Sequence, residues 1–116
     1  MLYFDPLVAW IGSAWYTELL MTRKDILQTL SKFQQDRRDE FGIVRLGVFG
    51  STARDQFGDE SDVDVVVELA HPDLFALIGI KQELEEALHR PVDVVRYREN
   101  MNAFLKQRIQ QEAIYV

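Results

Sequence analysis

The sequence contains no cysteine among its 116 residues. Neither disulfide bonds nor a cysteine–zinc site can therefore hold the fold, which has to rely on packing and hydrogen bonding. A chain without thiols is compatible with a reducing compartment, and we expect a cytoplasmic protein.

Positive charge is also in short supply. The chain has 13 Lys and Arg residues against 19 Asp and Glu residues, which gives a formal net charge of -6 at pH 7. An acidic chain is not drawn to phosphate backbones, so direct nucleic-acid binding is disfavoured. A site for an anionic ligand would need metal ions or a few well-placed cations.

The first segment lacks the features of a signal peptide or a membrane span. It has no Lys or Arg before residue 23, and Asp5, Pro6 and Glu18 interrupt its apolar run. A signal peptide needs a basic start, and a membrane helix needs about 20 apolar residues. We expect no membrane association. Residues 1–20 are interpreted as an extension or an extra helix without assigned chemistry, and residues 21–116 as the domain.

Apolar periodicity in residues 21–116 predicts alternating helices and strands. The expected order is a helix over 23–40 ended by Gly42, a strand over 43–49, a turn or short helix from 50, a strand over 62–69, a helix whose first turn holds Pro72, a strand over 92–97 and a helix over 100–112. This order predicts an α+β domain, a two-layer α/β arrangement in which helices pack on a small mixed β-sheet.

The apolar residues of the last two helices define their expected inward faces. These residues are Leu74, Phe75, Leu77, Ile78, Leu84 and Leu88 in the first of the two, and Met101, Phe104, Leu105 and Ile109 in the second. The apolar residues 114–116 at the end of the chain are available to dock on a partner.

Two aspartates, Asp62 and Asp64, begin the second predicted strand. Side chains two apart on a strand share a face, so these two lie side by side while Val63 and Val65 face the other way. Like charges this close disfavour each other's ionisation. A divalent cation removes that penalty, and magnesium prefers oxygen ligands of this kind.

A third carboxylate, Asp93, lies within the apolar strand predicted over 92–97. If this strand neighbours the one that carries Asp62 and Asp64, the three carboxylates can support two metal ions. Asp93 is then a metal ligand or a general base on the acceptor side. Each feature alone is commonly structural, because an isolated Asp-x-Asp is often a solvated strand edge.

Gly50 and Ser51 follow the first predicted strand directly. A turn of this kind exposes backbone N–H groups, and glycine allows a phosphate to approach closely. Arg54 is expected either to contact phosphate or to pair with acidic residues of the following loop. The segment is no Walker loop, since no Gly-Lys-Ser/Thr follows, and a Gly-Ser after a strand is usually only a turn.

The combination of these motifs is more specific than any one of them. Gly50-Ser51 followed by Asp62-Val63-Asp64 resembles the signature of the DNA polymerase β-like nucleotidyltransferase superfamily, most closely its minimal nucleotidyltransferase branch. Residues 46–54, 61–67, 91–95 and 108–116 all look like that branch, so the resemblance covers about residues 21–116. One departure is Asp55, where many relatives carry glycine.

The resemblance implies a role for each motif. Gly50 and Ser51 would bind the triphosphate of ATP, and Asp62, Asp64 and Asp93 would hold two Mg²⁺ ions. Members of the branch are typically antitoxins, encoded beside a HEPN-domain ribonuclease toxin. The implied activity is transfer of AMP from ATP to a tyrosine of that toxin, within a hetero-oligomer.

Two alternatives to this function remain open from the sequence. One is a non-catalytic antitoxin that neutralises its toxin by binding and occlusion. The other is an adenylyltransferase for a small molecule such as an aminoglycoside. Larger relatives of that second kind carry an additional helical domain that recognises the acceptor, and residues 21–116 leave no room for one.

Overall fold

The computed structural model describes residues 21–54 and 62–116. Its strands are β1 (Ile43–Phe49), β2 (Val63–Leu69), β3 (Val92–Arg96) and β4 (Ile114–Tyr115), and its helices are α2 (Arg23–Phe41), α3 (Gly50–Ala53), α4 (Leu74–Leu88) and α5 (Ala103–Glu112). The expectation for residues 1–20 concerns a segment outside the described residues and stays a prediction.

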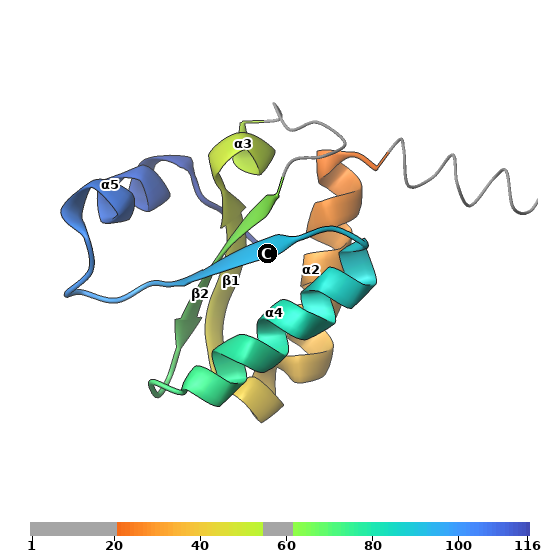
Figure 1. The fold of residues 1–116 in the computed structure, drawn as a ribbon, viewed down its shortest axis with the longest axis horizontal. Helices are drawn as coiled ribbons and strands as arrows, with labels where there is room; N and C mark the ends of the chain where they lie inside the picture. Colours follow the sequence, from red (N-terminus) through yellow and green to blue (C-terminus); the bar gives the residue numbers. More distant parts are fainter. Residues whose placement is uncertain (1–20, 55–61) are drawn as a thin grey trace, which may run out of the picture.

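The four strands form one mixed sheet in the order β3-β2-β1-β4. Strand β1 pairs antiparallel with β2 and with β4, whereas β2 and β3 run parallel. Parallel neighbours need a crossover connection, and α4 provides it. Helices α2 and α4 cover one face of the sheet, and α5 lies beyond the other (Figure 1). The predicted α+β class with a small mixed sheet is confirmed.

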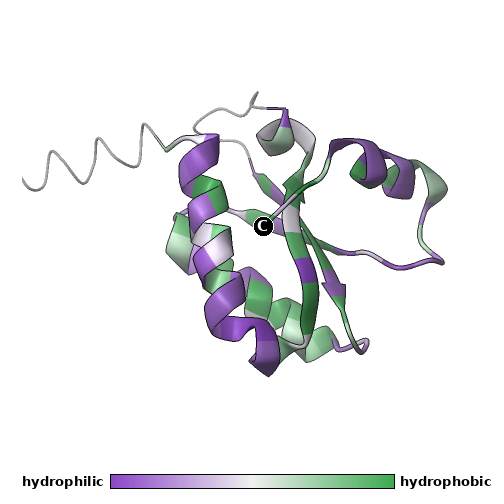
Figure 2. Cartoon of the chain, turned by 180° about the vertical axis from the view of Figure 1, so that it is seen from behind, coloured by the Kyte–Doolittle hydropathy of each residue, from purple (hydrophilic) through white to green (hydrophobic). Residues whose placement is uncertain are grey.

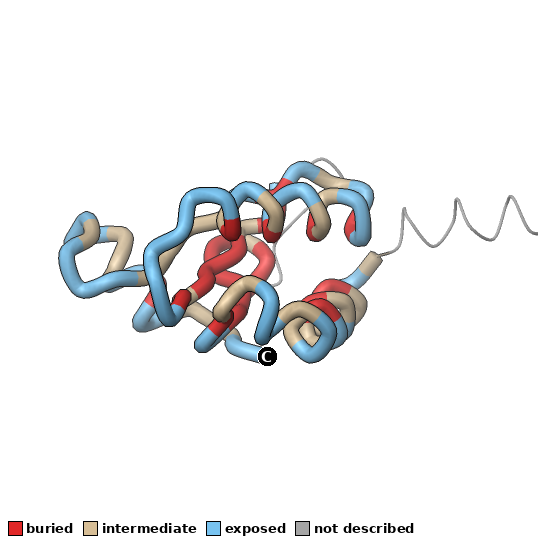
Figure 3. Tube along the Cα trace, turned by 90° about the horizontal axis from the view of Figure 1, so that it is seen from below, coloured by how far each residue is buried: buried red, intermediate tan, exposed pale blue. Residues whose placement is uncertain are grey.

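The main core lies between the sheet and the helix pair α2 and α4. On β2 the side chains of Val63, Val65 and Val67 are fully buried and pack there with residues such as Ile26 of α2 and Ile80 of α4. In Figure 3 the buried segments gather in the strands and on the sides of the helices that face them. This face of the sheet therefore supplies most of the apolar burial that stabilises the domain.

A smaller apolar cluster lies on the opposite face of the sheet, beneath α5. Phe49 of β1, Val66 of β2 and Ile109 of α5 are buried together in it. Because side chains alternate along a strand, Val66 identifies the face to which Asp64 also belongs. The carboxylates of interest thus lie on the α5 side of the sheet.

The ends of α2 follow the sequence closely. Thr22 caps its N-terminus in a reciprocal pair with Asp25, in which each side chain accepts a hydrogen bond from the other residue's backbone N–H. The helix stops where Gly42 adopts a φ of 68°, a conformation that glycine tolerates. The predicted helix and its glycine stop are confirmed.

Helix α4 begins differently from the prediction. Its N-cap is Asp73, whose carboxylate accepts hydrogen bonds from the N–H groups of Phe75 and Ala76. Pro72 therefore precedes the cap and does not lie in the first turn. Aspartate is a strong N-cap because it satisfies otherwise unpaired N–H groups, and this fixes the start of the helix.

The predicted inward face of α4 is wrong at its N-terminal end. Leu74, Phe75 and Ile78 are exposed, with 82% of Phe75 accessible to solvent. The buried stripe instead runs through Ala76, Ile80, Leu84 and Leu88 at a spacing of four residues. Hydrophobic residues cover much of α4, whereas α2 is largely hydrophilic on its outer side (Figure 2). Periodicity alone therefore does not select one face of α4.

Helix α5 and the strand after it differ in detail from the sequence prediction. Helix α5 begins at Ala103, after the N-cap Asn102, and Phe104 is 81% exposed instead of facing inward. Residues Ile114–Tyr115 form β4, which pairs with Val48 and Gly47 of β1. The apolar end is thus an edge strand of this sheet, and its docking on a partner stays a prediction. Within the described ranges, no helix is both long and apolar enough to cross a membrane.

Candidate active site

The site begins with two aspartates on neighbouring strands. In the parallel pairing of β2 and β3, Asp64 lies directly beside Asp93. Register partners of parallel strands present their side chains on the same face, so both carboxylates belong to the α5 side. The sequence prediction that the strand with Asp93 neighbours the strand with Asp64 is confirmed.

The crossover helix α4 fixes the start of β3 at Val92, the residue directly before Asp93. Glu85 of α4 accepts a hydrogen bond of 2.9 Å from the backbone N–H of Val92. Lys81, one turn earlier, donates to the carbonyl oxygen of Val92 and pairs with Glu85 at 3.1 Å. Both backbone groups of Val92 are therefore tied to α4, which helps to hold the register that brings Asp93 to Asp64.

Asp64 is half-buried in a cluster of charges. Burial raises the pKa of its carboxyl group, and the negative charges of Asp93 and Asp62 raise it further. Arg108 of α5 and Arg54 oppose this rise in the pKa. Two acidic and two basic side chains from separate parts of the chain therefore interact with Asp64.

This donor set suits a divalent cation chemically. The carboxylates are hard oxygen ligands, and their mutual repulsion at Asp64 is what a dication would relieve. Asp62, just before β2, and Asp93 are exposed and can reorient. Among residues 21–54 and 62–116, no three carboxylate or imidazole groups are already arranged as a metal site. The residues present fit magnesium by their chemistry, and Asp64 and Asp93 share one face of the sheet.

The turn after β1 touches this carboxylate cluster. Gly50 has a φ of 68°, and a Cβ atom added to it would overlap Oδ2 of Asp64. The antiparallel register of β1 and β2 accounts for this contact, because Phe49 pairs with Asp64. The Gly50-Ser51 turn and the aspartate pair, separate in the sequence, therefore meet at one point. Ser51 lies next to Gly50 at the start of α3 and is partly exposed.

A fourth carboxylate, Glu112, was missed by the sequence prediction. Its Oε1 atom accepts a hydrogen bond of 3.2 Å from the N–H of Gly50 and one of 3.0 Å from Nη1 of Arg54. Nη2 of Arg108 lies 3.8 Å from the same oxygen. Arg54 thus pairs with the end of α5, and the loop acids considered as its partners lie outside the described residues. Only the family-like segment 108–116 hinted that Arg108 and Glu112 mattered.

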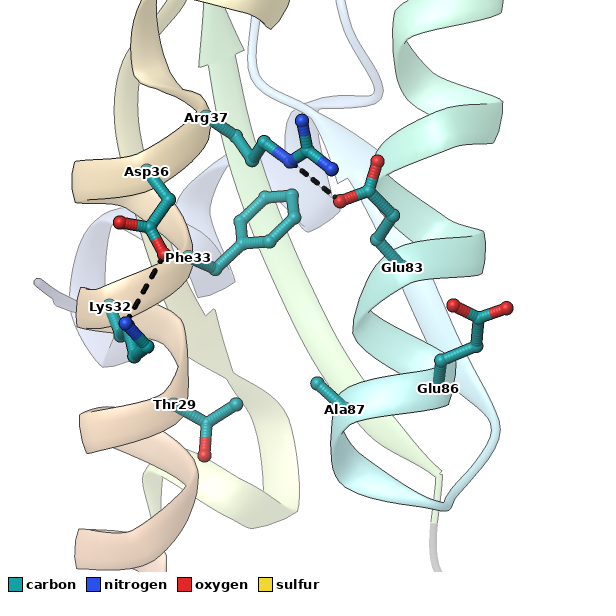
Figure 4. A pocket seen from close by; sticks show the side chains of 8 residues that line it. All are labelled: Thr29, Lys32, Phe33, Asp36, Arg37, Glu83, Glu86 and Ala87. Carbon is teal, nitrogen blue, oxygen red and sulfur yellow. Dashed lines mark hydrogen bonds and ion pairs between the residues drawn. The ribbon is translucent and has the colours of Figure 1, made fainter.

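A separate groove between α2 and α4 lies on the opposite face of the sheet from Asp64. It has a volume of about 680 Å³, and Phe33 contributes to its lining. Its charged residues are largely paired: Arg37 contacts Glu83 at 2.8 Å across the groove, and Lys32 lies 3.4 Å from Asp36 (Figure 4). Because these charged groups already pair with one another, we assign the groove no chemistry.

The comparison with known proteins agrees with the geometry. Residues 30–116 match the family described as nucleotidyltransferase domain. The chain belongs to this nucleotidyltransferase family. The resemblance inferred from the sequence is therefore confirmed, and the nucleotidyltransferase is a transferase enzyme.

Individual relatives narrow the comparison. The nucleotidyltransferase is similar to protein adenylyltransferase MntA of Thermococcus cleftensis, with 30% identity over 98 residues that cover 84% of this chain and 98% of the relative. It also resembles a chain from a toxin–antitoxin crystal structure with AMP-PNP, with 25% identity, a TM-score of 0.64, and coverage of 76% of this chain and 69% of that one.

A third similarity concerns the fold alone. A chain from the complex of a tri-AMPylated HEPN toxin with an MNT antitoxin of Shewanella oneidensis aligns with a TM-score of 0.58 at 24% identity. The alignment covers 78% of this chain and 70% of that chain.

Proposed function

We propose that this nucleotidyltransferase is an antitoxin that transfers AMP from ATP to a tyrosine of a cognate HEPN-domain toxin, with Mg²⁺ as cofactor. The adenylyltransferase named among its relatives and the toxin–antitoxin structure with AMP-PNP among its structural neighbours support this proposal. In this proposal the partner protein supplies the acceptor hydroxyl.

One observation carries the catalytic part of the proposal. Asp64 lies beside Asp93 on the neighbouring strand and in contact with Gly50 at the end of β1. Nucleotidyl transfer needs carboxylates that would hold Mg²⁺ and groups that would bind phosphate within a few ångströms of each other. The two carboxylates and the Gly50 turn come together from segments that are distant in sequence, which supports these roles.

Each group then has a distinct role. Backbone N–H groups at Gly50 and Ser51 and the guanidinium of Arg54 would hold the triphosphate. Asp62, Asp64 and Asp93 would hold Mg²⁺, which would neutralise charge on the triphosphate and on the departing pyrophosphate. Arg108, close to Glu112 and Asp64, adds positive charge on the α5 side.

The reaction is an in-line displacement at the α-phosphorus of ATP. The acceptor tyrosine oxygen forms a bond to that phosphorus, the bond to the oxygen that bridges to the β-phosphorus breaks, and pyrophosphate leaves. The phenolic proton passes to a carboxylate oxygen of Asp93, which lies at the exposed edge of the cluster.

Intact mass spectrometry tests the proposal directly. The product of the neighbouring gene is incubated with this protein, ATP and magnesium, and a gain of one or more AMP units is expected, located on tyrosine by fragmentation. Asp64→Asn should abolish the gain. Asp36→Asn is the matched control, because Asp36 is an exposed aspartate on α2 that pairs with Lys32 and lies away from the site.

The other functions predict different results. If Asp64→Asn still neutralises the toxin without any mass gain, occlusion by binding accounts for the antitoxin activity. If AMP appears on an aminoglycoside and not on the partner protein, the small-molecule alternative is correct.

A further inference from the structure

Glu112 lies where the phosphates of a nucleotide would bind. It is the last residue of α5, and 24% of its side chain is exposed. Two residues later β4 begins and pairs with β1, so the backbone at Glu112 is held beside the end of β1. Its carboxylate can leave by side-chain rotation, whereas its backbone cannot move far without unpairing β4.

The carboxylate of Glu112 makes the contacts that a bound anionic ligand would make. One carboxylate oxygen accepts hydrogen bonds from the backbone N–H of Gly50 and from the guanidinium of Arg54, and Arg108 lies nearby. A carboxylate held by a backbone N–H and a guanidinium uses the same donors that phosphate oxygens use. A triphosphate approaching Gly50 would therefore meet a negative charge already in place, and two anions this close repel each other.

We propose that Glu112 is an internal competitor for the nucleotide triphosphate, and this inference rests on the proposed function. With no nucleotide bound, its carboxylate accepts the hydrogen bonds of Gly50 and Arg54 and stabilises the turn after β1. A triphosphate has to displace it, so the intrinsic affinity for the nucleotide is reduced by the cost of breaking these contacts. Glu112 thereby sets the nucleotide concentration at which the site fills.

The opposite role for Glu112 gives the opposite sign. If Glu112 served to position Arg54 and Arg108 for the phosphates, its removal would weaken nucleotide binding. If it competes with the phosphates, its removal strengthens binding. The sign of the change in affinity thus separates a competitor from a positioning residue.

The test is an equilibrium titration with AMP-PNP and Mg²⁺ on the full chain. Glu112→Gln keeps the shape of the side chain and removes its charge, and Glu112→Ala removes its contacts altogether. Glutamine and alanine both favour helical conformation, so neither variant should disrupt the end of α5. We expect the Kd for AMP-PNP to fall about tenfold in both variants, because the nucleotide no longer has to break a partly exposed charge-assisted contact.

Glu99→Gln is the matched control. Glu99 pairs with Lys106 of α5 at 2.8 Å, and its side chain is 86% exposed. The variant therefore removes one negative charge that pairs with α5 but does not contact Gly50. Its Kd for AMP-PNP should equal that of the wild type. Inorganic triphosphate, used as a second probe, should show the same tightening in Glu112→Gln, because the competition concerns the phosphates alone.

The outcomes separate this inference from the function on which it rests. Equal or weaker binding of AMP-PNP by Glu112→Gln and Glu112→Ala, with binding by the wild type intact, would overturn the competitor role alone. Tightening of the same size in Glu99→Gln would overturn it too, since a general charge effect would then suffice. No binding of AMP-PNP by wild type and variants would overturn both this inference and the proposed function.

Discussion

Gly50 and Asp64 constrain each other at the level of single residues. The left-handed backbone of Gly50 disfavours residues with a side chain, and the Asp64 carboxylate fills the space in which a Cβ atom would lie. Glycine at this position therefore serves the turn and the site together.

Replacing Gly50 by alanine should affect both stability and activity. We expect Gly50→Ala to lower the free energy of unfolding by about 1 kcal/mol for the left-handed conformation and by at least ~1 kcal/mol more for the overlap with Asp64. Displacement of the carboxylate should also abolish AMP transfer. Urea denaturation and the mass assay measure the two effects.

The chain provides its own control for this substitution. Gly42 has the same φ of 68°, but a Cβ atom added there would meet nothing within 4 Å. Gly42→Ala should therefore show the conformational cost alone and retain full transfer activity. Equal losses of stability and activity in the two variants would show that contact with Asp64 is unimportant.

Removing the charge of Asp64 should separate catalysis from folding. In Asp64→Asn we expect transfer to slow by about a thousandfold, which corresponds to a loss of ~4 kcal/mol of transition-state stabilisation. Without metal, the melting temperature should stay equal or rise, because repulsion from Asp93 and Asp62 is relieved. A sharp drop in the metal-free melting temperature would instead identify Asp64 as a structural residue.

At the level of elements, the two sides of α4 should differ strongly in their contribution to stability. Ile80 is fully buried against the sheet, and Ile80→Ala should cost about 3 kcal/mol of unfolding free energy. Phe75 is mostly exposed, and Phe75→Ser should change it by less than about 0.5 kcal/mol. Urea denaturation of the two variants checks the corrected face, and a large loss in Phe75→Ser would contradict it.

The pairing of β4 with β1 depends on the absence of a side chain at position 47. A Cβ atom added to Gly47 would collide with the carbonyl oxygen of Ile114 and lie 3.0 Å from Cα of Tyr115. Gly47→Ala should cost about 1–3 kcal/mol of unfolding free energy. The N–H of Val116, which donates to the carbonyl of Leu46, should also exchange faster with solvent.

A neighbouring substitution on the same strand controls for this experiment. Val44 lies on β1 but is 43% exposed, so Val44→Ala should leave the exchange of the Val116 N–H unchanged. Unaltered exchange in Gly47→Ala as well would mean that the strand pair tolerates the added methyl group.

The sequence predicted those elements whose signals are local. The strand Ile43–Phe49 and the glycine stop at Gly42 have clear local patterns, and both were correct. The face of α4 was not predictable, because its apolar residues occupy more than one side and only packing against the sheet selects the stripe. Strand β4 spans two residues, too few to show any periodicity.

The site shows the same division between local and distant information. The Gly-Ser turn and the aspartate pair could be recognised from spacing within short segments. The contact of Glu112 with Gly50 joins residues 62 positions apart, and no local pattern encodes such a distance. Long-range pairs of this kind become visible only once the sheet brings their elements together.

At the scale of the whole molecule, carboxylates with lowered pKa values predict sensitivity to acid. The pKa of Glu85 is lowered by the backbone N–H of Val92 and by Lys81, that of Asp25 by the backbone and hydroxyl of Thr22, and that of Glu99 by Lys106. Such groups stabilise the fold fully above their ordinary pKa and lose this contribution as pH falls through the folded-state pKa.

We therefore expect the free energy of unfolding to decrease below about pH 4.5, the ordinary pKa of glutamate. Asp64 acts in the opposite direction, since its raised pKa makes its ionised form unfavourable in the folded state, but it is one group against three. Urea midpoints at neutral pH and at roughly pH 4 measure the effect.

Glu85→Gln should lower stability at neutral pH and reduce the loss on acidification. Glu86→Gln, an exposed neighbour on α4, is the control and should behave like the wild type. A wild-type midpoint that does not change with pH would contradict the assignment.

The parallel pairing of β2 and β3 determines how much of the chain the proposed activity requires. Two antiparallel strands can form one short contiguous segment, because a tight turn joins them. Asp64 and Asp93 instead lie on parallel strands, which become neighbours only through the crossover helix α4. That helix in turn needs the sheet to pack on. A fragment ending before β3 would keep the Gly-Ser turn and one pair of acids, yet never their companion. The proposed chemistry therefore needs the complete sheet, because its carboxylates come from two separate strands.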